Sequence, residues 1–181
     1  MRTPILIFIL VSILLNSCDK GLSPEMAEPK VGFSGTINFL GDWDKSINQT
    51  LVVLFKTPLL SKDDFNVFNL KYVSDTIPNG SQLFDYSTND NPLINNVEAG
   101  EYAYLAVAQS KKNIITLNRE DWFIVGVYYL NDDLSQPGKL VIPEATFVTD
   151  VNIICDFNNP PPQPPGGIEL LNRLKAFLQN N

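Results

Sequence analysis

The sequence predicts an all-β protein whose main domain is an antiparallel Greek-key β-sandwich of about seven strands. Apolar residues alternate with polar ones, or form short apolar runs, at intervals through residues 31–157. Clusters of Gly, Pro, Asn and Asp separate these runs, as turns separate the strands of a sandwich. The whole chain of 181 residues is about the length of one domain with short extensions.

An export signal is expected over residues 1–17. Arg2 supplies a positive charge, and Ile5–Leu15 is an apolar run of eleven residues. As a helix this run spans only about 16 Å, roughly half of a bilayer core, so it is too short to cross a membrane. A short apolar run behind a positive charge is typical of a signal peptide.

The signal ends in Leu15-Asn16-Ser17-Cys18. This motif resembles the lipobox of bacterial lipoproteins, with an aliphatic residue at −3, a small residue at −1 and then cysteine. The resemblance implies that Cys18 is diacylglycerated, that the signal is cut before it, and that the new amino terminus is acylated. Metabolic labelling with palmitate would detect this lipid. Two or three acyl chains, at about 0.8 kcal/mol per buried CH₂, make a stable anchor. The expected location is the bacterial cell envelope, and the alternative is a plain secretory signal with an incidental cysteine.

Residues 18–30 are expected to be the lipidated cysteine and a tether. Asp19–Lys30 is polar, contains two prolines and has no apolar periodicity. As a flexible coil it reaches about 20 Å, which would hold the domain close to a membrane.

The β-sandwich is expected over residues 31–157. Thr50–Lys56 is a continuous apolar run, which predicts a strand buried on both faces. Ser61–Phe68 is the one helical candidate inside the domain, because Ser61 and Asp64 have capping-box spacing. The expected strands are Val31–Phe39, Thr50–Lys56, Leu70–Val73, Leu83–Tyr86, Tyr102–Ala108, Trp122–Leu130 and Thr146–Phe157.

Cys155 would be the only thiol left once Cys18 carries lipid, so no intrachain disulfide can support the fold. It alternates with Val151, Ile153 and Phe157 on one face of the last strand. This pattern predicts a small structural core residue rather than a nucleophile.

The C-terminal region changes character. Residues 158–167 are rich in Pro and end in two glycines, which predicts an extended spacer with a hinge. Residues 168–181 are expected to hold a short amphipathic helix, since Ile168–Leu178 has apolar residues at helical spacing. This segment would dock on its own domain or be disordered, or it would bind an envelope partner protein or a membrane surface.

One segment carries a family resemblance. Leu93–Ala108 has an apolar residue, a turn with Gly100, then Tyr102 and an alternating strand. It resembles the corner of transthyretin-like and carboxypeptidase-regulatory-like sandwiches, and immunoglobulin-like domains share the Gly-x-Tyr element. Phe33–Ile37 and Leu51–Lys56 resemble the first two strands of those domains. Gly100 and Tyr102 are therefore expected to be structural, with a positive φ at the glycine and a backbone hydrogen bond from the tyrosine.

Composition excludes several chemistries. The chain has no histidine, which rules out a Ser-His-Asp triad, a Cys-His pair and histidine-bearing metal sites. Two cysteines cannot make a Cys₄ centre. A net charge of −7 argues against nucleic-acid binding. No cofactor and no metal is expected.

The expected function is a non-catalytic binding or assembly role in the envelope. The alternative is a glycan-binding module, with Trp43, Tyr128 and Tyr129 as possible ligand contacts. A third hypothesis is a hydrolase that uses paired carboxylates. The close pairs are Asp42/Asp44, Asp63/Asp64, Glu120/Asp121 and Asp132/Asp133.

Overall fold

The structure is a computed structural model that describes residues 30–131 and 133–167. The all-β prediction is confirmed, because these residues form eleven strands and only two short 3₁₀ turns. The expected signal, Cys18, most of the expected tether and the C-terminal segment 168–181 lie outside the described residues. Within the described part, no helix is long and apolar enough to cross a membrane.

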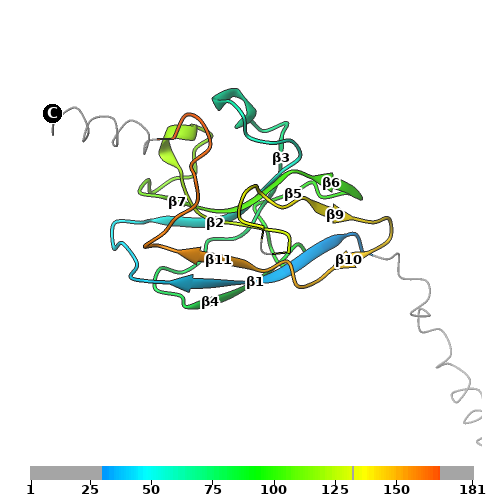
Figure 1. Cartoon of the computed structure of the whole chain (residues 1–181), viewed down its shortest axis with the longest axis horizontal. Helices are drawn as coiled ribbons and strands as arrows, with labels where there is room; N and C mark the ends of the chain where they lie inside the picture. The colour runs from blue at the N-terminus through cyan, green and yellow to red at the C-terminus, as the bar shows by residue number, and fades with distance from the viewer. Residues whose placement is uncertain (1–29, 132, 168–181) are drawn as a thin grey trace, which may run out of the picture.

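Two sheets form the two layers of the molecule (Figure 1). The first contains β1 (Gly32–Leu40), β4 (Leu83–Ser87), β10 (Phe147–Val148) and β11 (Ile153–Asp156). The second has the order β5-β3-β2-β7-β8 and contains β2 (Gln49–Phe55), β3 (Leu70–Val73), β5 (Ile94–Asn95), β7 (Tyr104–Ser110) and β8 (Phe123–Val127). A separate ribbon pairs β6 (Gly100–Tyr102) with β9 (Leu140–Ile142). Several of these strands are only two or three residues long, too short to stand out as separate segments in the sequence.

The first sheet is mixed, which corrects the expectation of a purely antiparallel sandwich. β1 pairs in parallel with β10 at its Gly32 end and with β11 at its Leu40 end. It pairs antiparallel with β4 alone. Parallel neighbours need a long connection, and here the rest of the domain supplies it because β1 is the first strand and β11 the last.

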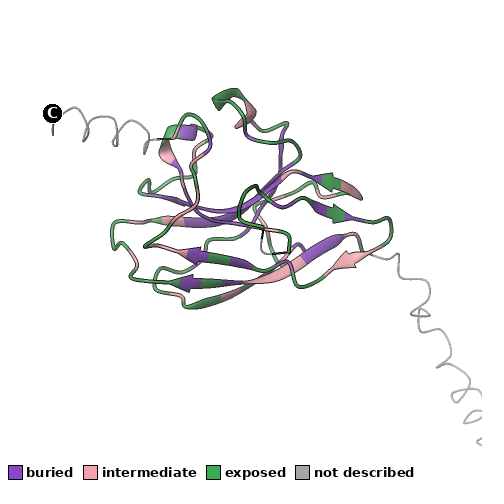
Figure 2. Cartoon of the chain, in the orientation of Figure 1, coloured by how far each residue is buried: buried purple, intermediate pink, exposed green. Residues whose placement is uncertain are grey.

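Two apolar cores lie on the two faces of the second sheet. β2 and β7, which contribute to both cores, are buried along almost their whole length (Figure 2). Val52 and Leu54 of β2 face the core between the sheets, and Leu51, Val53 and Phe55 face an outer core. This confirms that β2 is buried on both faces. The outer core is covered by loops that contribute Leu59, Phe65 and Trp122.

The helix expected over Ser61–Phe68 is reduced to one 3₁₀ turn, η2 (Lys62–Asp64). The Asp64 carboxylate accepts the backbone N–H of Ser61, as the spacing suggests. The next residues turn away because the Asn66 side chain accepts the backbone N–H groups of Phe68 and Asn69. Such side-chain bonds give the backbone an alternative to a helix.

The Pro-rich segment, residues 158–167, packs on the domain and is called the strap below. The Gln163 side chain accepts the N–H of Ile124 at 2.8 Å and donates to its carbonyl at 2.7 Å, so it pairs with β8. The buried Arg119, in η3 (Arg119–Asp121), donates to the Pro164 carbonyl at 3.0 Å. A Cβ at Gly167 would lie 2.8 Å from the Arg119 guanidinium, so a glycine allows this close packing.

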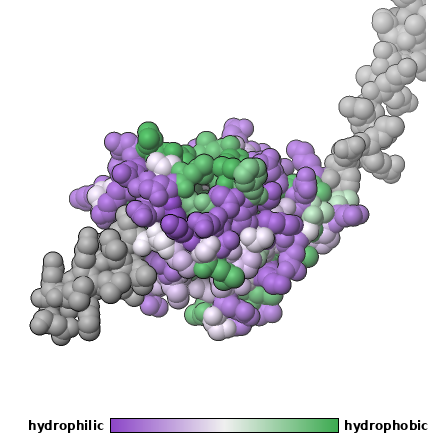
Figure 3. All heavy atoms as spheres, turned by 90° about the horizontal axis from the view of Figure 1, so that it is seen from above, coloured by the Kyte–Doolittle hydropathy of each residue, from purple (hydrophilic) through white to green (hydrophobic). Residues whose placement is uncertain are grey.

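Apolar side chains also gather on the upper face of the molecule (Figure 3). Exposed large apolar residues of the described chain include Leu60, Phe68, Ile114 and Leu134.

Candidate functional site

Trp43 is a packing residue at one end of the sandwich. Its ring lies 4.7 Å from that of Phe39 and 5.1 Å from that of Phe157, measured between centroids. Its indole N–H donates to the Ser81 carbonyl at 2.9 Å. Both the ring and the polar atom therefore already have protein partners, and the side chain is only partly exposed.

Tyr128 and Tyr129 follow β8 directly and are both partly buried. They lie on opposite faces, since Tyr128 packs on the core between the sheets and Tyr129 on the outer core. Neither ring stands on an open sheet face.

Trp43 and the two tyrosines lie at opposite ends of β7. Asp44, next to Trp43, pairs with Lys111, which directly follows β7. The Tyr128 N–H donates to the carbonyl of Leu105, near the start of β7. The three aromatic residues named as possible ligand contacts therefore do not form one site.

Gly100 and Tyr102 form a corner in β6. Gly100 has a φ of +143°, which favours glycine. The Tyr102 hydroxyl accepts the N–H of Glu98 and donates to its carbonyl, both at 2.8 Å. These contacts hold the turn before the strand, as in a tyrosine corner.

Cys155 lies fully buried in the core between the sheets. Burial raises the pKa of its thiol far above the ordinary value, so the sulfur stays protonated. A protonated, enclosed thiol is a poor nucleophile.

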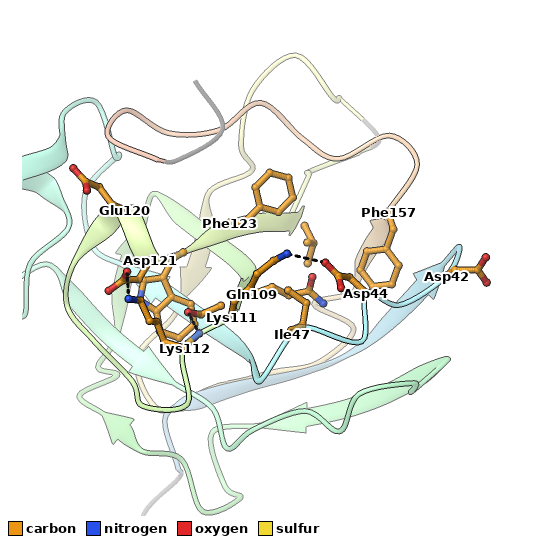
Figure 4. A pocket seen from close by; sticks show the side chains of 13 residues that line it. Asp42, Asp44, Ile47, Gln109, Lys111, Lys112, Glu120, Asp121, Phe123 and Phe157 are labelled. Carbon is orange, nitrogen blue, oxygen red and sulfur yellow. Dashed lines mark hydrogen bonds and ion pairs between the residues drawn. The ribbon is translucent and has the colours of Figure 1, made fainter. Parts of the chain in front are cut away.

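A pocket lined by both polar and apolar side chains lies at one end of the core between the sheets (Figure 4). This end pocket has a volume of about 570 Å³, within the usual range of small-molecule sites. Its apolar wall includes Phe123, Val125 and Phe157, which also belong to or pack on that core. Its polar wall carries Gln109, Ser110 and charged side chains from three segments, namely Asp42, Asp44, Lys111, Lys112, Glu120 and Asp121.

Two ion pairs stand at the rim of the end pocket (Figure 4). Lys111 lies 3.1 Å from Asp44, and Lys112 lies 3.6 Å from Asp121. Hydrogen bonds from Ser46, with a further contribution from Lys111, lower the pKa of Asp44 to about 2. Asp44 is therefore ionised at neutral pH and acts as an acceptor.

Gln109 is one of several residues of this pocket that the sequence did not single out. It is only 6% exposed, and its Nε2 has no hydrogen-bond partner. A buried polar group without a partner costs about 1–3 kcal/mol. Its position in the sequence indicates an unusual residue. Leu105, Val107 and Gln109 alternate on the inward face of β7, where an apolar residue is expected.

Two of the four carboxylate pairs named from the sequence, Asp42/Asp44 and Glu120/Asp121, meet at the end pocket. Asp63/Asp64 belongs to η2 and lies elsewhere, and Asp132 lies outside the described residues. Over residues 30–131 and 133–167, no three acidic or cysteine side chains converge in a metal-binding group.

No protein-family model matches the chain, and comparisons with curated proteins and with solved structures find no match.

Proposed function

We propose that the chain is a lipid-anchored bacterial envelope protein whose sandwich has a non-catalytic binding role. The lipobox at Leu15–Cys18 supports the anchor. The corner at Gly100 and Tyr102 supports a transthyretin-like Greek-key relationship for the sandwich.

The observation that carries this proposal is the placement of the end pocket relative to the tether. The chain joins the sandwich at Gly32, the first residue of β1. The pocket lies beyond the other end of β1, where Asp42 and Asp44 follow Leu40. Nine extended residues span about 30 Å, so a tethered domain would hold the pocket well away from its attachment point. That arrangement suits the capture of a ligand from the space beyond the membrane surface.

The state of Asp44 makes it unsuitable as the general acid of a hydrolase. A carboxylate-dependent hydrolase needs a carboxyl group that holds a proton near neutral pH. The pKa of Asp44 is instead lowered, because the ionised carboxylate is hydrogen-bonded by Ser46 and paired with Lys111.

A glycan-binding module is the second candidate, and the end pocket favours it. The pocket combines apolar rings with charged and amide groups, which suits a ligand with both C–H faces and hydroxyls. A protein partner bound by the helix expected over residues 168–181 is the first alternative to a glycan as ligand.

The anchor is tested by metabolic labelling with radioactive palmitate, followed by membrane fractionation. The natural chain is expected to be labelled and membrane-bound, and Cys18→Ala is expected to lose both properties. Cys155→Ala is the matched control, since it removes the other cysteine of the chain and should leave labelling intact. Labelling of Cys18→Ala at the natural level would refute the anchor.

A further inference from the structure

We propose that the end pocket binds one neutral sugar residue of an oligosaccharide and that Gln109 donates a hydrogen bond to it. This inference rests on the proposed binding role and specifies its ligand and its site. The contact residues differ from the aromatic residues singled out in the sequence.

The first argument is the unpartnered amide. Gln109 is 94% buried yet lines the pocket, and its Nε2 has no acceptor among the described residues. Figure 4 shows it in the middle of the lining residues, between the charged rim and the apolar wall. Buried donors in native proteins have partners, from protein or water, almost without exception, so this N–H is free to pair with a ligand atom in the pocket.

The neighbouring strand provides a second unpartnered polar group. Thr50 of β2 lies directly opposite Gln109 in the β2–β7 register. It is 1% exposed, and its hydroxyl oxygen also lacks a partner. Residues directly opposite in a sheet have neighbouring side chains, so the two unpartnered groups lie side by side at this end of the core.

The charge of the pocket selects a neutral ligand. Four carboxylates line it against two lysines, and each lysine is already paired with a carboxylate. An anionic ligand would meet excess negative charge, and a simple ammonium ion offers no acceptor for the Gln109 N–H. A hydroxyl or ring oxygen of a sugar accepts without adding charge.

The walls suit the two sides of a sugar ring. Phe123 and Phe157 are partly exposed and present apolar surface to the pocket. The face of an aromatic ring is electron-rich and attracts the polarised C–H groups of a pyranose. At the rim, Asp44 and Asp121 accept hydrogen bonds while Lys111 and Lys112 donate them, which matches hydroxyls that do both.

A peptide is the less suitable ligand because the adjacent sheet edge is occupied. Peptides commonly bind by adding a strand to an open edge. Here the edge strand is β8, and the Gln163 side chain forms hydrogen bonds with both the N–H and the carbonyl of Ile124. An added strand would have to displace the strap.

The test is titration of the full chain in detergent with neutral oligosaccharides, namely maltotriose, cellotriose, xylotriose and N,N′-diacetylchitobiose. A galacturonic acid trimer and a blocked tripeptide serve as comparison probes. Tryptophan fluorescence reports binding, because the chain has two tryptophans: Trp122 lines the pocket and Trp43 contacts Phe157. At least one neutral oligosaccharide is expected to saturate, and the acidic trimer and the tripeptide are expected to bind at least tenfold more weakly.

Gln109→Leu is the decisive variant. Leucine fills a similar volume and leaves no unpartnered amide, so the variant should fold at least as well as the natural chain while binding the sugar at least tenfold more weakly. Gln136→Leu is the matched control, since Gln136 is exposed and outside the end pocket. Thr50→Val gives a second variant from the neighbouring strand.

Several outcomes would overturn the inference. These are no saturable binding of any neutral oligosaccharide, unchanged binding in Gln109→Leu, or tighter binding of the tripeptide or the acidic trimer. Palmitate labelling of Cys18 is a separate measurement. A chain that is labelled with palmitate but does not bind sugar would therefore support the lipid anchor and contradict only the proposed sugar ligand.

Discussion

Gly126 in β8 faces the thiol of Cys155 in β11 so closely that no methyl group fits between them. The same position would also bring a Cβ within 2.9 Å of Ile153 and 3.0 Å of the Ile154 carbonyl. The two sheets approach each other here, and the glycine allows it. We expect Gly126→Ala to lower the free energy of unfolding by about 1–3 kcal/mol through overpacking, measured by urea denaturation.

The contact with Cys155 supplies the control. Removing the sulfur in Cys155→Ala should make room for part of the added methyl, so the double variant should be more stable than the sum of the two single effects. Simple additivity would show that the close approach to the thiol is not the source of the strain.

Tyr102→Phe should cost about 1–2 kcal/mol of stability, because it removes both hydrogen bonds to the Glu98 backbone. Tyr104→Phe is the matched control, since Tyr104 is similarly buried without a hydroxyl bond of this kind. Thermal or urea unfolding of the two variants measures the difference. Equal losses of stability in Tyr102→Phe and Tyr104→Phe would show that the Tyr102 hydrogen bonds do not stabilise the corner.

Gln163→Ala should release the strap from β8. Hydrogen exchange at the Ile124 amide is expected to speed up at least tenfold, because its N–H loses the Gln163 acceptor. Gln136→Ala, at an exposed site, should leave that amide unchanged. If the Ile124 amide keeps its protection in Gln163→Ala, the strap is held by other contacts, and Arg119 with Pro164 would be the next to test.

Stability should be flat from about pH 5 to 8 and fall in alkali. The chain has no histidine to titrate in the neutral range. Burial raises the pKa of Cys155 and of Tyr72, Tyr86 and Tyr104, so these groups ionise more easily in the unfolded chain. Above the unfolded pKa values, near 8.5 for Cys and 10 for Tyr, each group lowers stability by about 1.4 kcal/mol per pH unit.

Urea midpoints measured from pH 5 to 11 check this expectation. Cys155→Ala should move the onset of the decline from about pH 9 to about pH 10, since only the tyrosines remain. A decline that begins below pH 8 would contradict the assignment.

Local pattern was enough to predict the strands with strong periodicity. Alternation in β1 and the apolar run in β2 predicted their positions, and β2 is buried on both faces as expected. The parallel pairing of β1 with β11 could not be predicted, because the two strands lie more than 100 residues apart and the local sequence of each does not indicate which strand it pairs with.

The strap and the end pocket escaped prediction for a related reason. Proline content predicts an extended backbone, and residues 160–164 are in neither helix nor strand, but their pairing with β8 depends on the Gln163 side chain. Residue type alone suggests an aromatic side chain such as Trp43 as a ligand contact, whereas the Trp43 ring packs on Phe39 and Phe157. Gln109 was detectable only as a polar residue at an inward position of β7.

The parallel pairing of β1 with β11 has a consequence for the order of events in the proposed export of the chain. Ile37 pairs with Ile153, so the first strand cannot gain this neighbour until nearly the whole domain has emerged. Contacts between such distant residues form slowly because a large loop must close first. A chain exported from its N-terminus would thus stay unfolded enough to pass through a narrow channel, and the sandwich would complete its folding only once its last strand had crossed.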